Sequence, residues 1–384
     1  MKKALSLSIL LFFAFALHAA NLYVSTLGND AADGLSWSNA KECVQAAISA
    51  AQSGDTVFVA AGLYAQRIVM SNGVHVFGGY DATTGKRDIL ANMTILDGTS
   101  LQNRLVDASA HFSMVTYVDG LVLQNANHSV RGGAAELSRN VVMNQCTIRQ
   151  CVTNKGGGGV YNNGGRVVNC VIELCEALDA GGGVHNYGGV VENCIIRGCK
   201  GKYGAIRNEM NGVVRNCLVH NNEPSTTAWP NSGGIYNPSG VVYNNTLACN
   251  YGSQYAGFHS DNIAYNNLMW NNQSEEGFAD PANFVSGEKT KNGSGHNAAD
   301  FYFDAENFTV YLGVDNMASD GPHFVAPTLY VGAPKNDAEI AAMRAANFSL
   351  MAGSPVIDRA KMGLDLAYDI DNNPRPVNGR ADIG

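Results

Sequence analysis

The chain has 384 residues, of which 46% are hydrophobic and 15% charged, with a formal net charge of −8 and a pI near 5.6. This apolar content excludes a disordered acidic chain, and the negative charge disfavours nucleic acid as a partner, because nucleic acid binding needs a basic face. The 43 glycines and 41 asparagines argue against a helix-rich enzyme, since both residue types tolerate positive φ and weaken helix interiors. A fold dense in turns is indicated.

Residues 1–20 are predicted to be an export signal. Lys2 and Lys3 precede an apolar run from Ala4 to Leu17, and the small pair Ala19-Ala20 offers a cleavage point. No later run of about twenty apolar residues follows, so we expect no transmembrane helix in the mature chain. The expected location is secreted or on the outer cell surface, in a Gram-negative envelope.

Residues 21–55 are predicted to form an N-terminal strand and a capping helix. The segment from Ser38 to Gln52 has a capping residue, helix formers and apolar positions three and four apart, and Gly54 follows it. A helix here would cover the open end of a solenoid that begins at Thr56.

Two phrases repeat together between residues 144 and 260. In the first, an Asn or Gln precedes Cys146, Cys170, Cys194 and Cys217, at steps of 24, 24 and 23 residues. In the second, small residues and glycines precede an apolar residue, a variable residue and an asparagine, and these asparagines are Asn162, Asn186, Asn208 and Asn237. Two phrases locked at one period define a structural repeat.

The period and composition predict an all-β fold, a single-stranded right-handed parallel β-helix with coils over residues 56–272. The apolar runs are short and β-branched, which excludes helical repeats, and the leucine ladder of leucine-rich repeats is missing. Like residues should stack about 4.8 Å apart in successive coils. Three columns are expected: aliphatic (Ile148, Ile172, Ile196, Val219, Leu247), thiol (Cys146, Cys170, Cys194, Cys217) and asparagine (Asn162, Asn186, Asn208, Asn237).

Nine cysteines in an exported chain leave two alternatives open. They are buried thiols that act as small hydrophobic residues, or some of them form disulfides between coils. A metal site is disfavoured, because the repeat itself explains the cysteine spacing. After residue 273 the period is lost, and residues 273–384 are interpreted as an irregular insertion followed by closing coils. Filling residues 56–350 at 24 residues a coil would give about twelve coils.

Several segments resemble known proteins. Asn21-Leu-Tyr-Val24, Phe77-Gly-Gly-Tyr80 and Thr94-Ile-Leu-Asp-Gly98 resemble the start of bacterial secreted parallel β-helix proteins of the pectin-lyase-like superfamily. The Gly-Gly-Gly-Val-Tyr-Asn and Asn-Cys phrases are similar to the repeat of polymorphic outer membrane proteins. The segments Phe348–Asp358 and Asp369–Gly384 resemble a C-terminal closing module like those that precede surface anchors. The resemblance implies the fold and export of the protein, but it says very little about any activity.

A charged column follows the thiols at Arg149, Glu173, Arg197 and His220. One interpretation is an exposed face held by ion pairs between coils. The alternative comes from the lyases of this superfamily, in which a base removes the proton next to a uronate carboxylate and a cation, commonly Ca²⁺, stabilises the charge. The candidate catalytic residues of such a lyase are Glu173, Glu192, Arg197, Lys200 and Lys202.

The leading hypothesis is a monomeric, non-catalytic surface or secreted protein that presents a long face for adhesion or glycan binding, to a polysaccharide or to a host or cell-surface glycan or protein. No cofactor or metal is expected under it. The alternative is a polysaccharide lyase or glycoside hydrolase that works in a lateral groove, and only this alternative involves Ca²⁺. Trp229, Tyr236, Tyr243, Tyr251 and Tyr255 are candidates for stacking on sugar rings.

Overall fold

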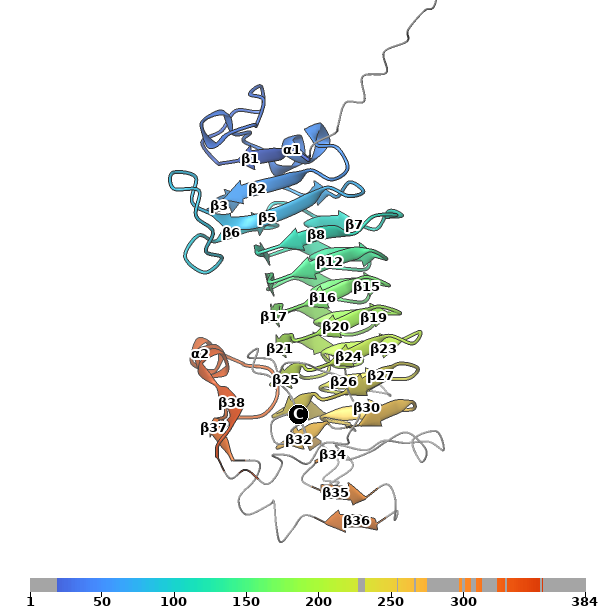
Figure 1. Cartoon of the computed structure of the whole chain (residues 1–384). Coiled ribbons are helices and arrows are strands. Elements are labelled where there is room, and N and C mark those ends of the chain that lie inside the picture. The colour runs from blue at the N-terminus through green and yellow to red at the C-terminus, as the bar shows by residue number, and fades with distance from the viewer. Residues whose placement is uncertain are drawn as a thin grey trace, which may run out of the picture.

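The chain winds as a stack of β-coils along one axis (Figure 1). This structure, a computed structural model, describes residues 19–226, 232–253, 255–265, 267–274, 297–298, 301–304, 309–312, 323–328, 330–352 and 354. The signal run 1–18 and the resemblance after residue 354 lie outside the described residues. Strands of successive coils pair in parallel and in register, as Ile148 pairs with Ile172 and Ile172 with Ile196. The expected all-β right-handed parallel β-helix is confirmed.

The middle coils, from β7 to β22, visit four sheets in the order C, A, B and D, and of these sheets the coils before and after them visit only C, A and B. Sheet A holds β1 (Asn21–Val24), β2 (Thr56–Ala60), β5 (His75–Tyr80), β8 (Thr116–Asp119), β12 (Val141–Asn144), β16 (Arg166–Val168), β20 (Val190–Glu192), β24 (Val213–Arg215), β27 (Val241–Tyr243) and β31 (Ile263–Tyr265). Sheet B holds β3 (Gly62–Tyr64), β6 (Thr94–Asp97), β9 (Leu121–Gln124), β13 (Thr147–Arg149), β17 (Val171–Glu173), β21 (Ile195–Arg197), β25 (Leu218–His220), β28 (Thr246–Ala248) and β32 (Leu268–Trp270), followed by β34 (Asn297–Ala298), β35 (Phe301–Asp304) and β36 (Thr309–Leu312).

The other two sheets are shorter. Sheet C holds β4 (Ile68–Val69), β7 (Val106–Ala108), β11 (Ala135–Ser138), β15 (Val160–Asn163), β19 (Val184–Tyr187), β23 (Ile206–Glu209), β26 (Ile235–Asn237) and β30 (Phe258–Ser260). Sheet D holds β10 (Asn127–His128), β14 (Val152–Thr153), β18 (Glu176–Ala177) and β22 (Lys200–Gly201), and β29 (Tyr251–Gly252) pairs separately with β33 (Gln273–Ser274). Sheet A has ten strands, fewer than the twelve coils expected.

A short helix, α1 (Val44–Ala50), covers the first coil and buries Val44, Ala47 and Ile48. It begins six residues after Ser38, where the helix was expected to start, because the residues before it adopt other structures. A 3₁₀ turn (Trp37–Asn39) comes first, and Lys41 then pairs with Val24 beside β1. Its N-cap residue, Cys43, therefore forms no capping side-chain hydrogen bond, and the backbone N–H of Gln45 in the first turn donates to Gln66 Oε1 at 3.2 Å instead.

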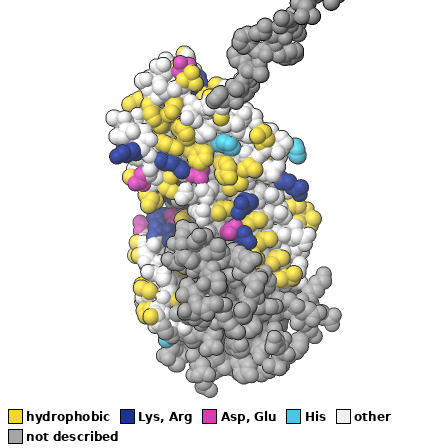
Figure 2. All heavy atoms as spheres, viewed as in Figure 1, with side chains coloured by type: hydrophobic (Ala, Val, Ile, Leu, Met, Phe, Trp, Pro, Cys, Tyr) yellow, Lys and Arg dark blue, Asp and Glu magenta, His cyan; other side chains and the backbone are white. Residues whose placement is uncertain are grey.

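Aromatic side chains cover the outer face of sheet A in the first coils, where hydrophobic side chains gather in Figure 2. The ring of Phe58 lies 5.7 Å from that of Tyr23 and 6.5 Å from that of Phe77. The Arg87 guanidinium lies 5.3 Å from the centre of the Phe77 ring. These tilted contacts stabilise the outward side chains of coils that stack in register.

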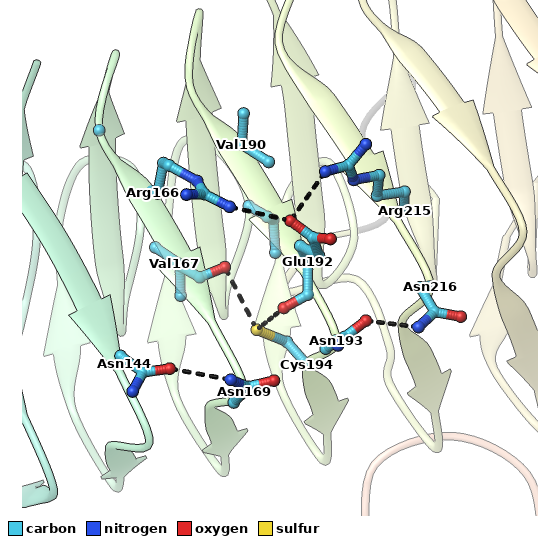
Figure 3. A network of polar contacts seen from close by, with 12 residues as sticks. Asn144, Arg166, Val167, Asn169, Val190, Glu192, Asn193, Cys194, Arg215 and Asn216 are labelled. Carbon is cyan, nitrogen blue, oxygen red and sulfur yellow. Dashed lines mark hydrogen bonds and ion pairs between the residues drawn. The ribbon is translucent and has the colours of Figure 1, made fainter. Parts of the chain in front are cut away.

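Inside the coil the thiols stack as a buried column. Cys194 lies with its Sγ 3.1 Å from the carbonyl oxygen of Glu192 and 3.5 Å from that of Val167 (Figure 3). Burial raises the pKa of the Cys146, Cys170 and Cys194 thiols well above its usual range. None of the nine cysteines forms a disulfide, and the eight that are buried fill the core as small hydrophobic side chains.

Asparagines form a hydrogen-bonded ladder at the turn from sheet C to sheet A. The Asn186 Nδ2 donates to Asn208 Oδ1 at 2.7 Å and to the carbonyl of Gly189 at 3.0 Å, and the Asn162 Nδ2 donates to Asn186 Oδ1 at 2.8 Å. The Asn208 Nδ2 continues the ladder to Asn237 Oδ1 at 2.9 Å. Each fully buried amide thus bonds to the next coil and also donates to a backbone carbonyl of its own turn.

Replacing one rung should destabilise the coil. In Asn186→Ala the Asn208 Oδ1 and the Asn162 Nδ2 each lose a buried partner, so we expect the free energy of unfolding to fall by about 2–4 kcal/mol. Urea unfolding followed by circular dichroism measures this loss. Asn163→Ala, at an exposed position one coil away, should change stability by less than about 0.5 kcal/mol. Equal effects of the two variants would contradict the ladder's role.

The described C-terminal residues do not continue the stack. Residues 323–352, which we call the strap, comprise β37 (Phe324–Ala326), α2 (Asp337–Ala345) and β38 (Asn347–Leu350) and run back along the coils beside sheet B (Figure 1). Phe324 and Phe348 pack with Leu268 and Ala248 of sheet B in a second apolar cluster. Apolar residues on the outer face of sheet B thus provide a binding surface for the strap, whose two strands pair with each other. The division that places closing coils within residues 273–384 stays a prediction.

His220 lies beneath the strap, with its ring 4.8 Å from that of Phe348 and its Nδ1 2.8 Å from Asn221 Oδ1. Burial lowers the pKa of His220 from 6.5 to about 4. An unfolded chain binds this proton more readily, so the stability that neutral His220 provides is complete above pH 6.5 and is lost as the pH falls to 4.

We therefore expect wild-type protein to lose about 3 kcal/mol more stability between pH 7 and pH 4 than His220→Gln, which has no titrating group there. The comparison needs the free energy of unfolding of both proteins at several pH values. Other histidines and carboxylates titrate in both and cancel in the difference. If the free energies of unfolding of the two proteins fell in parallel as the pH is lowered, protonation of His220 would not contribute to acid unfolding.

Candidate functional site

The predicted charged column is present, but the strap buries its centre. Glu173 pairs in register with Arg149 and Arg197. Its carboxylate is only 4% exposed and lies 2.8 Å from Arg197 and 2.6 Å from Arg344 of the strap. Burial opposes ionisation of Glu173, but the two arginines outweigh it and hold the pKa below its usual range. The expected exposed face is wrong here, and Glu173 and Arg197 hold the strap in place.

The other candidates lie on different faces. Glu192 is on sheet A, with its carboxylate 3.2 Å from Arg166 and 3.0 Å from Arg215 (Figure 3). Lys200, on sheet D, pairs with Glu223 at 2.9 Å. Lys202 follows sheet D, with its Nζ 5.0 Å from the centre of the Tyr203 ring.

The structure thus does not bring Glu173, Glu192, Arg197, Lys200 and Lys202 into one site. The chain turns a corner between neighbouring sheets, so residues a few positions apart face different directions.

A polar hollow of about 490 Å³ instead follows the outer face of sheet C and the turns that lead into it from sheet D. We call this hollow the groove. It is lined by Arg104, Val130, Arg131, Glu136, Lys155, Gly156, Asp179, Ala180, His185, Arg207 and Glu209. Its residues come from five successive coils, so the groove runs along the solenoid axis.

An outward column of sheet C forms the floor of the groove. Glu136 pairs in register with Tyr161, Tyr161 with His185, and His185 with Arg207. The Tyr161 and His185 rings meet edge to face at 5.0 Å. A Cβ at Gly156 would lie 2.5 Å from His185 Nδ1, so a glycine is needed where the imidazole fills the floor.

Two carboxylates of the groove are engaged by cations. Glu209 lies 2.6 Å from His185 Nε2 and 2.8 Å from Arg207, and Glu136 pairs with Arg104. Burial lowers the pKa of His185, although Glu209 acts in the opposite direction. For Glu209 burial raises the pKa, but His185 and Arg207 bring it below its usual range. Glu209 therefore stays ionised and holds both neighbours.

Two cations of the groove remain without a carboxylate. Neither Arg131 nor Lys155 forms an ion pair with any described residue. Arg131 lies with its guanidinium 5.0 Å from the centre of the Tyr161 ring and donates to Tyr161 Oη at 3.2 Å. The groove has four Arg and Lys side chains against three carboxylates, whereas the whole chain carries −8. An anionic ligand would meet a locally favourable potential here.

Aromatic rings extend the column beyond the groove. The Tyr203 and Tyr236 rings stack at 5.1 Å, and Arg207 lies 4.6 Å from the centre of the Tyr203 ring. His259 follows Tyr236 in register and contacts the Tyr255 ring at 4.2 Å. Of the aromatic residues predicted to stack on sugars, Tyr236 and Tyr255 thus lie on this face. Tyr243 lies on sheet A and Tyr251 in β29, whereas Trp229 is outside the described residues.

The floor of the groove has a sequence pattern that could have been recognised. Tyr161, His185, Arg207, Tyr236 and His259 occupy the variable position between the apolar residue and the asparagine of the second phrase. That position alternates with two buried ones, so it must point outward. This repeating outward position therefore predicts the residues of the groove floor. Arg131 and Lys155 lie in turns and occupy no repeating position, so the sequence does not indicate them.

The chain matches no protein-family profile, and no curated protein matches it. Among solved structures it is similar to the pectate lyase Pel9A, with 13% identity over 96% of both chains and a TM-score of 0.47. It is also similar to a rhamnogalacturonan lyase, with 12% identity over 84% of this chain and 98% of the other and a TM-score of 0.45. At such identity neither likeness bears on the activity of this chain.

The described residues contain no group of three His, Cys, Asp or Glu side chains placed to hold a metal ion. None of their helices has the length and apolar character needed to cross a membrane. In the groove itself, Arg131 and Lys155 are placed to bind an anion. The half-buried Tyr203 and Tyr236 rings beside the groove are placed to contact the faces of other rings.

Proposed function

We propose that the protein is an exported, non-catalytic β-helix protein that binds an acidic polysaccharide along the groove. The observation that carries this proposal is the charge arrangement on sheet C. Glu136 and Glu209 are engaged by internal cations, whereas Arg131 and Lys155 stand free in adjacent turns. A polymer with a carboxylate on its sugar rings supplies the missing negative charge.

The shape of the groove supports a polymer. Its lining spans five coils, and Tyr236 continues the same column with the Tyr203 ring of a neighbouring turn stacked on it. Rings at steps of about 4.8 Å offer repeated apolar surfaces to successive sugar units. Binding spread over several weak contacts suits a long flexible chain, because contacts that are weak alone add up along it.

The pairing of the carboxylates favours binding over catalysis. A general base must reach the proton it abstracts and must not be held by other groups. Glu209 is shared between His185 and Arg207, and His185 Nδ1 is buried without a partner against Gly156. The third carboxylate of the groove, Asp179, is exposed beside Lys155 and forms no ion pair with a described residue, so the lyase remains the second hypothesis.

Removing the two free cations should weaken polymer binding. For Arg131→Gln combined with Lys155→Gln we expect about ten-fold weaker binding of polygalacturonate, because each exposed charge contributes up to about 1 kcal/mol. Isothermal titration calorimetry at low and high salt measures the loss, and screening should reduce the difference at high salt.

The matched control is Arg166→Gln combined with Lys86→Gln, which removes the same charge on sheet A and in the loop after β5. Its affinity should equal that of wild type. Equal weakening by both double variants would mean that only net charge matters and would refute the groove. Absorbance of unsaturated sugar product, if it rose with the wild-type protein and polymer, would establish the lyase instead.

A further inference from the structure

The turns from sheet C to sheet A differ in length from coil to coil. Ser138 pairs with Asn163 on sheet C and Val142 with Arg166 on sheet A. Four positions therefore separate Ser138 from Val142 in one coil, but only three separate Asn163 from Arg166 in the next, where Gly164 and Gly165 form the turn. The same comparison, Tyr187 with Glu209 and Val190 with Val213, shows a Gly188-Gly189 turn followed by a longer turn of residues 210–212.

Two short glycine turns in succession recess this edge of the solenoid. Gly164 and Gly188 have φ of 85° and 69°, a conformation that glycine adopts without strain. The longer turns place Arg139 on one side and Met210 on the other. The recess, which we call the notch, measures about 490 Å³, and its lining includes His111, Arg139, Asn163, Gly164, Tyr187 and Met210.

The chemistry of the notch differs from that of the rest of this acidic protein. No carboxylate is among the residues that line it. Arg139 is exposed and forms no ion pair with a described residue, and the exposed His111 lies in the same wall. Tyr187 offers a half-buried ring, and Met210 is 53% exposed at the rim. The notch thus combines a free cation, an aromatic ring and an apolar edge around a floor without side chains.

We propose that the notch is a second binding site, separate from the groove, for one sugar ring that carries a carboxylate or sulfate group. Arg139 pairs with the anionic group, and the ring lies over the glycine turns between Tyr187 and Met210. The Asn163 side chain, which is exposed beside Gly164, supplies a donor and an acceptor for hydroxyl groups. The choice of a sugar over another ring-shaped anion rests on the proposed function.

Filling the floor tests the site with little risk to the fold. At Gly164 the atom nearest to an added Cβ is Arg139 Cβ at 3.7 Å. Asparagine tolerates positive φ, as Asn140 and Asn211 show with 68° and 60° in the neighbouring turns. Gly164→Asn should therefore fold and occupy the notch. Gly85→Asn is the matched control, because Gly85 has a φ of 68° in an exposed loop.

The measurement is binding of free glucuronate, a sulfated monosaccharide and neutral glucose by saturation-transfer NMR and calorimetry. All variants carry Arg131→Gln and Lys155→Gln, so that the groove does not contribute. We expect a Kd in the millimolar range for at least one anionic sugar, with glucose at least about ten-fold weaker. Gly164→Asn and Arg139→Gln should each weaken the anionic sugar about ten-fold, and Gly85→Asn should leave it unchanged.

Failure of this proposal and failure of the groove are distinguishable. Unchanged binding of the anionic sugar in Gly164→Asn, equal binding of glucose, or no binding of either anionic sugar would overturn the notch. None of these results changes the expected loss of polygalacturonate binding in the groove variant. Conversely, loss of anionic-sugar binding in the notch variants alone supports the second site even when the polymer does not bind the groove.

Discussion

The structure depends on one constraint, that every coil repeats the register of the previous one. A buried polar side chain in such a stack needs a complementary group at the matching position of the next coil. The asparagine ladder meets this condition, since each Nδ2 of Asn162, Asn186 and Asn208 donates to the Oδ1 of the next rung. A change of register by one residue would leave all these amides unpaired in an apolar core.

The same constraint explains why thiols and asparagines share a column. Cys217 is followed in its column by Asn245, whose Oδ1 accepts from the Cys217 backbone N–H at 2.9 Å. Asn267 then accepts from Asn245 in the same way. A thiol fits the column as a small apolar group, and an amide fits it as a rung. Either stacks on its own kind, so thiols give way to amides at a single point, between Cys217 and Asn245.

Inward residues could be predicted from the sequence because stacking forces them to repeat. The aliphatic column from Ile148 to Leu247 pairs as expected. Outward residues obey no such rule, so Tyr161, His185 and Arg207 share a position without sharing chemistry. The strap was missed for another reason. Arg344 meets Glu173 across 171 positions of sequence, and no local pattern records such a contact.

The register between coils constrains the inward residues but not the outward side chains or the lengths of the turns. These two features can therefore vary to form binding surfaces. On sheet B the strap uses that freedom, as Arg344 and Phe348 cover Glu173 and His220 and remove them from solvent. On sheet C no described residue of the strap pairs with the groove cations. The turns there vary instead, carrying Arg131 and Lys155 on one side of the sheet and shortening to glycine pairs on the other. Because a turn can change without disturbing the register inside, one rigid solenoid presents two chemically different hollows on the two sides of a single sheet.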